Sequence, residues 1–193
     1  MKTDVQFQQN LEDTLCGFLP QISFDGAIEK LFVYDFHDFD RIFEIGKISV
    51  ENETYQRLPV FSGENCVAIL MIWGIDNTTA IHDHHNYDGK IKILKGNLTE
   101  VSYRENLNFI EYDGAGTAYE NQIFPEELGG IHSIVNNSDN VSVSLHIYRT
   151  SKLDLNGVRI FDTENRKIAW LNENATSCSW HLSLNSYERV VQL

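Results

Sequence analysis

Three histidines with the spacing of metal ligands are the most informative residues of this sequence. His82 and His84 form a His-x-His pair, and His132 follows 48 residues after His84. Residues two apart in a β-strand project to the same side, so His82 and His84 are expected to point together and Asp83 the opposite way. A lone buried histidine is more often structural, but two on one strand face with a third near glycine favour a metal site. Imidazole binds zinc, copper, nickel and iron alike, so these ligands do not choose the metal.

The spacing resembles the two cupin motifs, with one departure. In the first motif a glutamate and then a glycine follow His-x-His, but here Gly89 stands at the glutamate position and Gly96 at the glycine position. The second motif, Gly-x-x-His-x-x-x-Asn, is matched in full by Gly129, His132 and Asn136. The histidines are therefore expected to hold a metal without an anionic ligand. Such a metal keeps its full double positive charge, which suits it to bind a thiolate and then oxygen.

Two neighbouring residues are weaker candidates for the metal site. Asp88 stands next to the missing glutamate and would become a carboxylate ligand if the strand register slipped. His85 points away from the face of His84, and we expect it at the surface or behind the ligands. The predicted ligand set is therefore His82, His84 and His132.

Length, composition and charge place further limits on the protein. At 193 residues, 42% of them hydrophobic, the chain suffices for one domain with a substantial core. Its net charge of −13 disfavours nucleic acid or an anionic membrane as partner, although a small anionic substrate needs only one local cation. The sequence has no secretory signal, no apolar run near the roughly 20 residues of a membrane span, and three scattered cysteines that do not suit a disulfide framework. We expect a cytoplasmic monomer.

The pattern of apolar residues predicts a mainly β protein with helices at its start. Residues 4 to about 48 carry apolar residues at helical spacing, interrupted at Pro20. Cys66 to Trp73 is an apolar run typical of a strand buried on both faces, and short segments separated by turn signals follow it. This spacing is typical of a sandwich or barrel. We expect one domain, 1–193, with a helical layer over about 1–48, a barrel over about 55–171 and a C-terminal extension over 172–193.

The segment Val141–Tyr148 alternates between an apolar and a polar face. The polar face consists of Ser142, Ser144, His146 and Tyr148. On these residues alone, a solvent-facing strand edge explains that face as well as a functional surface does.

Several segments that carry distinctive residues stand in a fixed order between about Tyr55 and Asp162. They are Tyr55-Gln56-Arg57, Met71-Ile72-Trp73-Gly74, Ile81–His84 with Leu94–Leu98, Gly130–His132 with Asn136, and Val143–Tyr148. In this order they resemble the cysteine dioxygenases, the thiol-oxidising branch of the cupins. The resemblance implies a cupin barrel, which is a double-stranded β-helix of the jelly-roll type. It also implies one iron(II) ion per chain, held by the three histidines, and conversion of L-cysteine and O2 to cysteine sulfinic acid in cysteine catabolism and taurine formation.

The resemblance also assigns roles to residues around the metal. Arg57 matches the residue that binds the substrate's carboxylate, which a guanidinium can hold with two hydrogen bonds. Tyr148 matches a tyrosine whose hydroxyl lies near the substrate and the oxygen site. His146 and Ser144 share its strand face, and we expect them to hold its proton in a hydrogen-bonded relay. The implied substrate-binding residues are Tyr55, Arg57, Met71 and Trp73.

One departure from the family concerns a covalent modification. Some members link a cysteine to the active-site tyrosine, and Gly89 occupies that cysteine's position here. Because Cys16, Cys66 and Cys178 do not fall near it in the sequence, no such crosslink is expected. The stretch from Asn172 onward matches nothing in the family.

Other functions fit the same residues less well. A dioxygenase for 3-mercaptopropionate, which lacks the amino group, tends to carry glutamine at the position of Arg57. Oxidation of cysteamine or of an N-terminal cysteine needs no carboxylate clamp there. A non-catalytic cupin that stores or senses a metal is the alternative from another class, since the fold hosts many functions. Such a protein has no use for Arg57 and Tyr148 beside the metal, so these two residues favour the enzyme.

Overall fold

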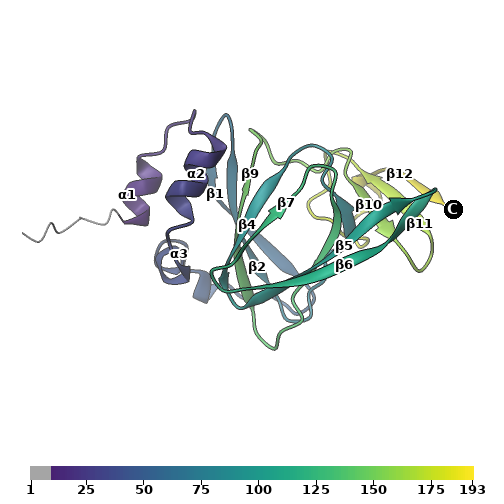
Figure 1. Ribbon diagram of the computed structural model, residues 1–193, viewed down its shortest axis with the longest axis horizontal. Coiled ribbons are helices and arrows are strands. Elements are labelled where there is room, and N and C mark those ends of the chain that lie inside the picture. The colour runs from purple at the N-terminus through teal and green to yellow at the C-terminus, as the bar shows by residue number, and fades with distance from the viewer. Residues whose placement is uncertain (1–9) are drawn as a thin grey trace, which may run out of the picture.

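The computed structural model describes residues 10–193 and shows two facing antiparallel sheets with short helices against one of them (Figure 1). The helices are α1 (Leu11–Cys16), α2 (Phe24–Leu31), α3 (Phe36–Phe43) and the 3-10 turns η1 (Ile45–Lys47) and η2 (Leu184–Ser186). The strands are β1 (Tyr55–Ser62), β2 (Val67–Trp73), β3 (Ile81–Asp83), β4 (Gly89–Lys95), β5 (Asn97–Asn106), β6 (Phe109–Tyr119), β7 (Ile123–Glu126), β8 (Ile131–Val135), β9 (Ser142–Tyr148), β10 (Arg159–Asp162), β11 (Lys167–Leu171) and β12 (Tyr187–Gln192). The predicted mainly β cupin barrel with N-terminal helices is confirmed. Residues 4–9 of the predicted helical segment lie outside the described residues.

Each α-helix begins at a polar side chain that caps its first turn. Asn10, Ser23 and Asp35 accept hydrogen bonds from backbone N–H groups in the first turns of α1, α2 and α3, respectively. Pro20 lies between α1 and α2, where the sequence predicts an interruption. Within residues 10–193, no helix has the length and apolar character needed to cross a membrane.

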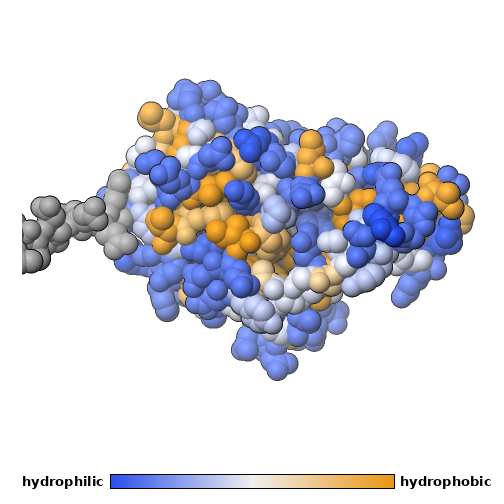
Figure 2. All heavy atoms as spheres, viewed as in Figure 1, coloured by the Kyte–Doolittle hydropathy of each residue, from blue (hydrophilic) through white to orange (hydrophobic). Residues whose placement is uncertain are grey.

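The first sheet, in the order β1-β2-β9-β4-β7, separates two apolar layers. Every residue of β2 and β9 is buried, which confirms the predicted strand buried on both faces. The outer face packs under the helices through Ala68, Leu70, Ile72, Val143, Leu145 and Ile147. The inner face fills the barrel with Val67, Ile69, Met71, Trp73, Ile91 and Ile93. On the face shown in Figure 2, hydrophobic residues gather where the helices meet this sheet.

The second sheet has the order β12-β11-β10-β3-β8-β5-β6, so β3 and β8 lie near its middle. The C-terminal residues belong to this sheet, because β12 pairs with β11. Cys178 and residues of β10 and β11 form an apolar cluster against which Trp180 and Leu182 pack. Residues 172–193 therefore fold back onto the barrel at the end opposite the helices (Figure 1).

Lys92 ties the helical layer to the first sheet. Its side chain is buried, and its ammonium group donates hydrogen bonds to the carbonyl oxygens of Phe32 at 2.7 Å and Tyr34 at 2.8 Å, just after α2. Carbonyl groups at a helix C-terminus have no partner within the helix and carry its negative dipole end. Burial lowers the pKa of Lys92, and the charges of Asp35 and Asp38 oppose that shift. The ammonium group thus satisfies two carbonyls that the fold buries.

We expect Lys92→Met to lower the free energy of unfolding by about 1–3 kcal/mol, because the two carbonyl groups would lose a charged donor. Lys90→Met is the matched control, since Lys90 lies on the same face of β4 but is exposed. Urea unfolding followed by circular dichroism measures both variants. Equal stabilities would show that the ammonium group does not hold the helices in place.

Candidate metal centre

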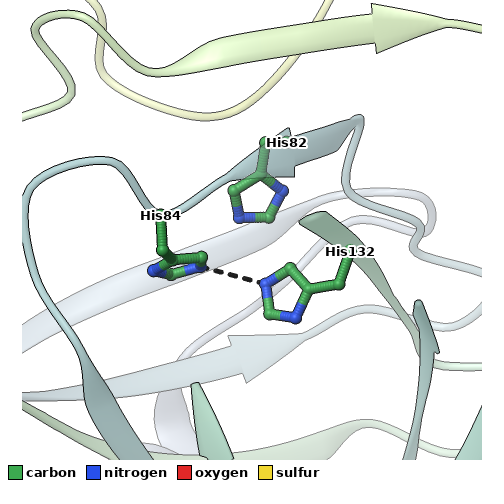
Figure 3. Close-up of side chains that lie close together, drawn as sticks. All are labelled: His82, His84 and His132. Atoms are coloured by element: carbon green, nitrogen blue, oxygen red, sulfur yellow. Dashed lines mark hydrogen bonds between the residues drawn. The ribbon is translucent and has the colours of Figure 1, made fainter. Parts of the chain in front are cut away.

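Strands β3 and β8 bring the three predicted ligands together (Figure 3). The strands are antiparallel neighbours, and His82 lies directly opposite His132. His84 follows the end of β3, where its N–H donates to Gly130 O at 3.0 Å and its carbonyl accepts from Gly129 N at 2.7 Å. All three side chains are buried, and one ring nitrogen of each lies within 4.8 Å of the others. The three imidazoles therefore converge on one point.

Hydrogen bonds to the outer ring nitrogens orient two of these imidazoles. Nδ1 of His82 lies 2.9 Å from the carbonyl oxygen of Ala80, and Nδ1 of His132 lies 2.7 Å from Oε1 of Glu100. Both partners are acceptors, which assigns the ring proton to Nδ1 and leaves the lone pair of Nε2 facing inward. Nε2 of His132 lies 3.0 Å from Nε2 of His84. Two inward-facing imidazole nitrogens at this distance fit a shared cation, so the residues suit a metal ion.

Burial keeps His84 in the neutral form that binds metals. Its Nδ1 atom is buried and makes no hydrogen bond. Burial lowers the pKa of His84 to about 3, with the carboxylate of Glu126 opposing the shift and the neighbouring histidines adding to it. A metal ion therefore does not compete with a proton for this ligand near neutral pH.

The inward face of β9 carries a chain of hydrogen bonds on the wall beside the histidines. The indole N–H of Trp73 donates to Oγ of Ser144 at 2.8 Å. Ser144 Oγ lies 2.8 Å from Nε2 of His146, and Nδ1 of His146 lies 2.9 Å from the hydroxyl of Tyr148. A solvent-facing edge is therefore the wrong explanation of these residues. The helical layer covers the other face of β9, so its polar face points into the barrel.

Arg57 brings a positive charge to the same wall. Its Nη2 lies 3.5 Å from the hydroxyl of Tyr55 and its Nη1 lies 3.5 Å from the carbonyl oxygen of Thr176, while Nε is buried without a hydrogen-bond partner. Burial works to lower the pKa of Arg57, but Tyr55 and Cys178 raise it, and the group stays charged. In the described part of the chain, the arginines that form ion pairs are Arg41, Arg104, Arg149 and Arg159. Arg57 is thus a half-buried cation without a carboxylate partner among the described residues.

These groups line one small cavity. Its walls consist of Tyr55, Arg57, Met71, Trp73, Thr79, His82, Glu126, Ile134, His146, Tyr148 and Cys178. All four predicted substrate-binding residues are among them, and Ser144 lies behind His146. The cavity volume is about 20 Å³, room for roughly one water molecule. A substrate therefore enters only when part of the wall moves. His84 and His132 also border a separate cavity of about 300 Å³.

Glu126 is a carboxylate inside the site that the sequence did not predict. Because β7 pairs with β4, Glu126 stands directly opposite Gly89, where the first motif lacks its glutamate. Its Oε1 lies 3.4 Å from Nε2 of His84 and 3.7 Å from Nε2 of His132, and its Oε2 lies 3.6 Å from Nδ1 of His146. The predicted ligand group of three histidines is present, and a carboxylate from the neighbouring strand β7 lies beside it.

The local sequence gives no signal that separates Glu126 from Glu127. Both stand in the segment that replaces the usual Pro-x-Gly of the second motif. The structure separates them, because Glu126 is buried on the inward face of β7 and Glu127 is exposed. Burial works to raise the pKa of Glu126, but the neighbouring His84, His146 and His132 lower it below its ordinary range.

Cys178 is the second residue of the site that the sequence did not predict. It lies in the segment between β11 and β12, and its N–H donates to the hydroxyl of Tyr55 at 3.3 Å. Burial works to raise the pKa of the Cys178 thiol, but the neighbouring His82 and Arg57 together outweigh that effect. The pKa of the thiol is therefore lowered. Burial likewise works to lower the pKa of His82, but Cys178 raises it to about 9, so in the metal-free protein a metal ion would displace a proton from this ligand. Residues of the expected C-terminal extension thus form part of the site.

The weaker ligand candidates lie away from the metal centre. Asp88 forms an ion pair with Arg149, with 3.2 Å between Oδ1 and Nε, and its side chain is 39% exposed. The register slip that would turn it inward does not occur, because Gly89 pairs with Tyr148 and faces the barrel. His85 is exposed at the surface, as predicted.

Solved structures of other proteins are similar to parts of this chain. The cupin domain of Schizosaccharomyces pombe Cnp3 is 11% identical, with a TM-score of 0.45, over 55% of this chain and 71% of that chain. A cupin superfamily protein from Desulfitobacterium hafniense is 12% identical, with a TM-score of 0.43, over 53% and 84%. A Klebsiella pneumoniae protein with a double-stranded β-helix domain is 11% identical, with a TM-score of 0.46, over 60% and 86%.

A family model gives a longer match than these structures do. The model described as Cysteine dioxygenase type I matches residues 37–163, well over half of the chain. The matched range includes His82, His84 and His132 together with Arg57 and Tyr148. It ends before Cys178.

We expect Glu100→Gln to weaken metal binding by about ten- to a hundredfold, because the carboxylate orients His132 and raises its basicity. Titration of the metal-free protein with Zn(II) measures the affinity. Glu120→Gln removes one exposed carboxylate and serves as the control, with unchanged binding. Equal affinities of the two variants would contradict the role of Glu100.

Proposed function

Because the chain belongs to the cysteine dioxygenase type I family, we propose that it is an iron(II)-dependent enzyme that converts L-cysteine and O2 to cysteine sulfinic acid. The family supports a thiol as substrate, and the three buried histidines support a metal. In this reaction the thiol R–SH becomes the sulfinic acid R–SO2H. Both oxygen atoms pass to sulfur, which loses the four electrons that O2 gains.

The observation that carries the choice of cysteine is Arg57 in the same cavity as His82. A guanidinium group beside a metal site repels the metal ion, so it does not serve a protein that only stores a metal. It does serve an enzyme whose substrate carries a carboxylate a few bonds away from the thiol. The buried Nε of Arg57, which has no hydrogen-bond partner, offers a donor for that carboxylate.

The remaining residues support this chemistry by holding the substrate and excluding water. Ferrous iron held by His82, His84 and His132 would supply the redox chemistry that lets O2 react with a thiolate. Met71 and Trp73 form the apolar part of the cavity wall. A cavity this narrow holds little water beside a bound substrate, which strengthens the interactions of charged groups inside it.

The hydrogen-bond chain on β9 fixes the direction in which Tyr148 points its proton. The indole N–H of Trp73 can only donate, so Ser144 Oγ accepts it and donates its own proton to Nε2 of His146. With Nε2 accepting from Ser144, His146 has a proton on Nδ1 and can donate it to the oxygen of Tyr148. Burial raises the pKa of Tyr148, so its hydroxyl stays protonated. That proton points into the cavity, where its acceptors are the Glu126 carboxylate and, in the proposed reaction, the substrate or oxygen.

Oxygen uptake by the iron(II)-loaded protein tests the proposed function. L-cysteine, 3-mercaptopropionate and cysteamine are supplied in parallel, and the sulfinate product is quantified. We expect uptake with cysteine, matched by an equal amount of cysteine sulfinic acid. Faster uptake with 3-mercaptopropionate would identify that thiol, and not cysteine, as the substrate. No uptake with any of the three would contradict the proposal that the protein is a dioxygenase of small thiols.

We expect Arg57→Gln to raise the KM for cysteine by roughly ten- to a hundredfold, because a charged hydrogen bond to the carboxylate contributes about 1.5–3 kcal/mol. Cysteamine has no carboxylate, so the variant should not impair whatever turnover cysteamine shows. Arg104→Gln, which removes an exposed arginine, is the control with unchanged kinetics. An unchanged KM for cysteine in Arg57→Gln would contradict the proposal that Arg57 binds the carboxylate of the substrate.

A further inference from the structure

We propose that Glu126 is a fourth protein ligand of the metal, so that the site consists of three imidazoles and one carboxylate. The inference rests on the proposed metal-dependent function and concerns the same site. It departs from the three-histidine site that the sequence predicts, because the carboxylate comes from β7 and not from the position after His-x-His in β4.

The strand pairing explains why the carboxylate comes from β7. A side chain at Gly89 has no room, since a Cβ atom there would lie 2.7 Å from the ring of Tyr148 and 2.9 Å from the carbonyl oxygen of Ile147. Directly opposite Gly89 on the neighbouring strand stands Glu126. Residues that face each other across an antiparallel pair project to the same side of the sheet. Glu126 therefore points into the barrel from the place next to the blocked position.

The distances between the side chains fit coordination of a single ion. Two ligand atoms that each lie about 2.1 Å from one ion are about 3.0 Å apart at a right angle and about 3.4 Å apart at the tetrahedral angle. The two Nε2 atoms of His84 and His132 are 3.0 Å apart, and Oε1 of Glu126 lies 3.4 Å from the first. Its distance of 3.7 Å from the second is slightly longer. One ion can thus contact all three atoms after a small movement of Glu126.

Glu126 is a buried carboxylate with no lysine or arginine in ion-pair contact among residues 10–193. The residue is 4% exposed, and its Oε2 makes no hydrogen bond. Its ion-pair contacts within residues 10–193 are with histidines alone, two of which are the metal ligands His84 and His132. A buried carboxylate oxygen without a hydrogen-bond donor or a cation nearby is disfavoured. A divalent metal ion at the point where the imidazoles converge would provide the missing charge.

A carboxylate ligand changes which groups of the substrate must bind the metal. It occupies one coordination position that a three-histidine site leaves open, and it removes one positive charge from the centre. A thiol that binds through sulfur alone then meets the needs of the site, and the amino group of cysteine is not required as a ligand. Selection among small thiols therefore depends mainly on the carboxylate clamp at Arg57.

Cobalt(II) titration of the metal-free protein tests the inference without thiol or oxygen. The affinity and the visible absorption spectrum are measured for the wild type, Glu126→Gln and Glu127→Gln. We expect Glu126→Gln to weaken binding at least about tenfold and to change the spectrum, because cobalt absorption reports the ligand set. Glu127→Gln removes the adjacent exposed carboxylate and should match the wild type in both measurements.

Glu126→Asp is the second variant, which keeps the charge but withdraws the carboxylate by one methylene group. A ligand role predicts a changed spectrum for Glu126→Asp, whereas a purely electrostatic role predicts the spectrum of the wild type. An unchanged spectrum in both Glu126 variants would overturn the inference, even if the affinity of Glu126→Gln fell. If the wild type itself bound no cobalt, the proposed metal-dependent function would fail as well. If the wild type bound cobalt and the Glu126 variants had the same affinity and spectrum as the wild type, the inference about Glu126 would fail and the proposed function would stand.

Discussion

The antiparallel register between β3 and β8 is the constraint on which the site depends. It places His82 directly opposite His132, with both imidazoles on the inner face of the second sheet. Because side chains alternate along a strand, a slip of one residue would turn His132 outward and bring Ile131 into the site. Pairing on both sides holds this register, since Ile160 of β10 lies opposite His82 and Ser102 of β5 lies opposite His132. The metal centre is therefore a product of the whole sheet, and the histidine motif alone does not build it.

The site also needs a strand that turns its polar side inward. On β9 the residues Ser144, His146 and Tyr148 face the barrel, so the apolar residues between them face outward. That outward face would be an exposed hydrophobic surface on a bare barrel. The three N-terminal helices cover it, and Lys92 fastens them by binding the carbonyl groups that follow α2. The helical layer is thus what allows the barrel interior to be polar enough for chemistry.

What the sequence could predict depended on how far apart the interacting residues lie in the chain. The two-residue spacing of His82 and His84 is local, and the apolar run of β2 marks its burial directly, so both were evident. Ordered motifs placed Arg57 and Tyr148 around the ligands. Glu126 was missed because its position depends on the pairing of β7 with β4, which no local pattern encodes. Cys178 was missed because a segment after β11 folds back against the cavity.

The fixed charges around the cavity favour a substrate with two negative groups. A metal dication with three neutral imidazoles and the proposed carboxylate ligand carries one net positive charge, and Arg57 carries another at a separate point of the wall. A thiolate at the metal and a carboxylate at Arg57 neutralise these charges one by one, which lowers the cost of burying all of them. Under the proposed function, these charges therefore favour a thiol carboxylate as substrate.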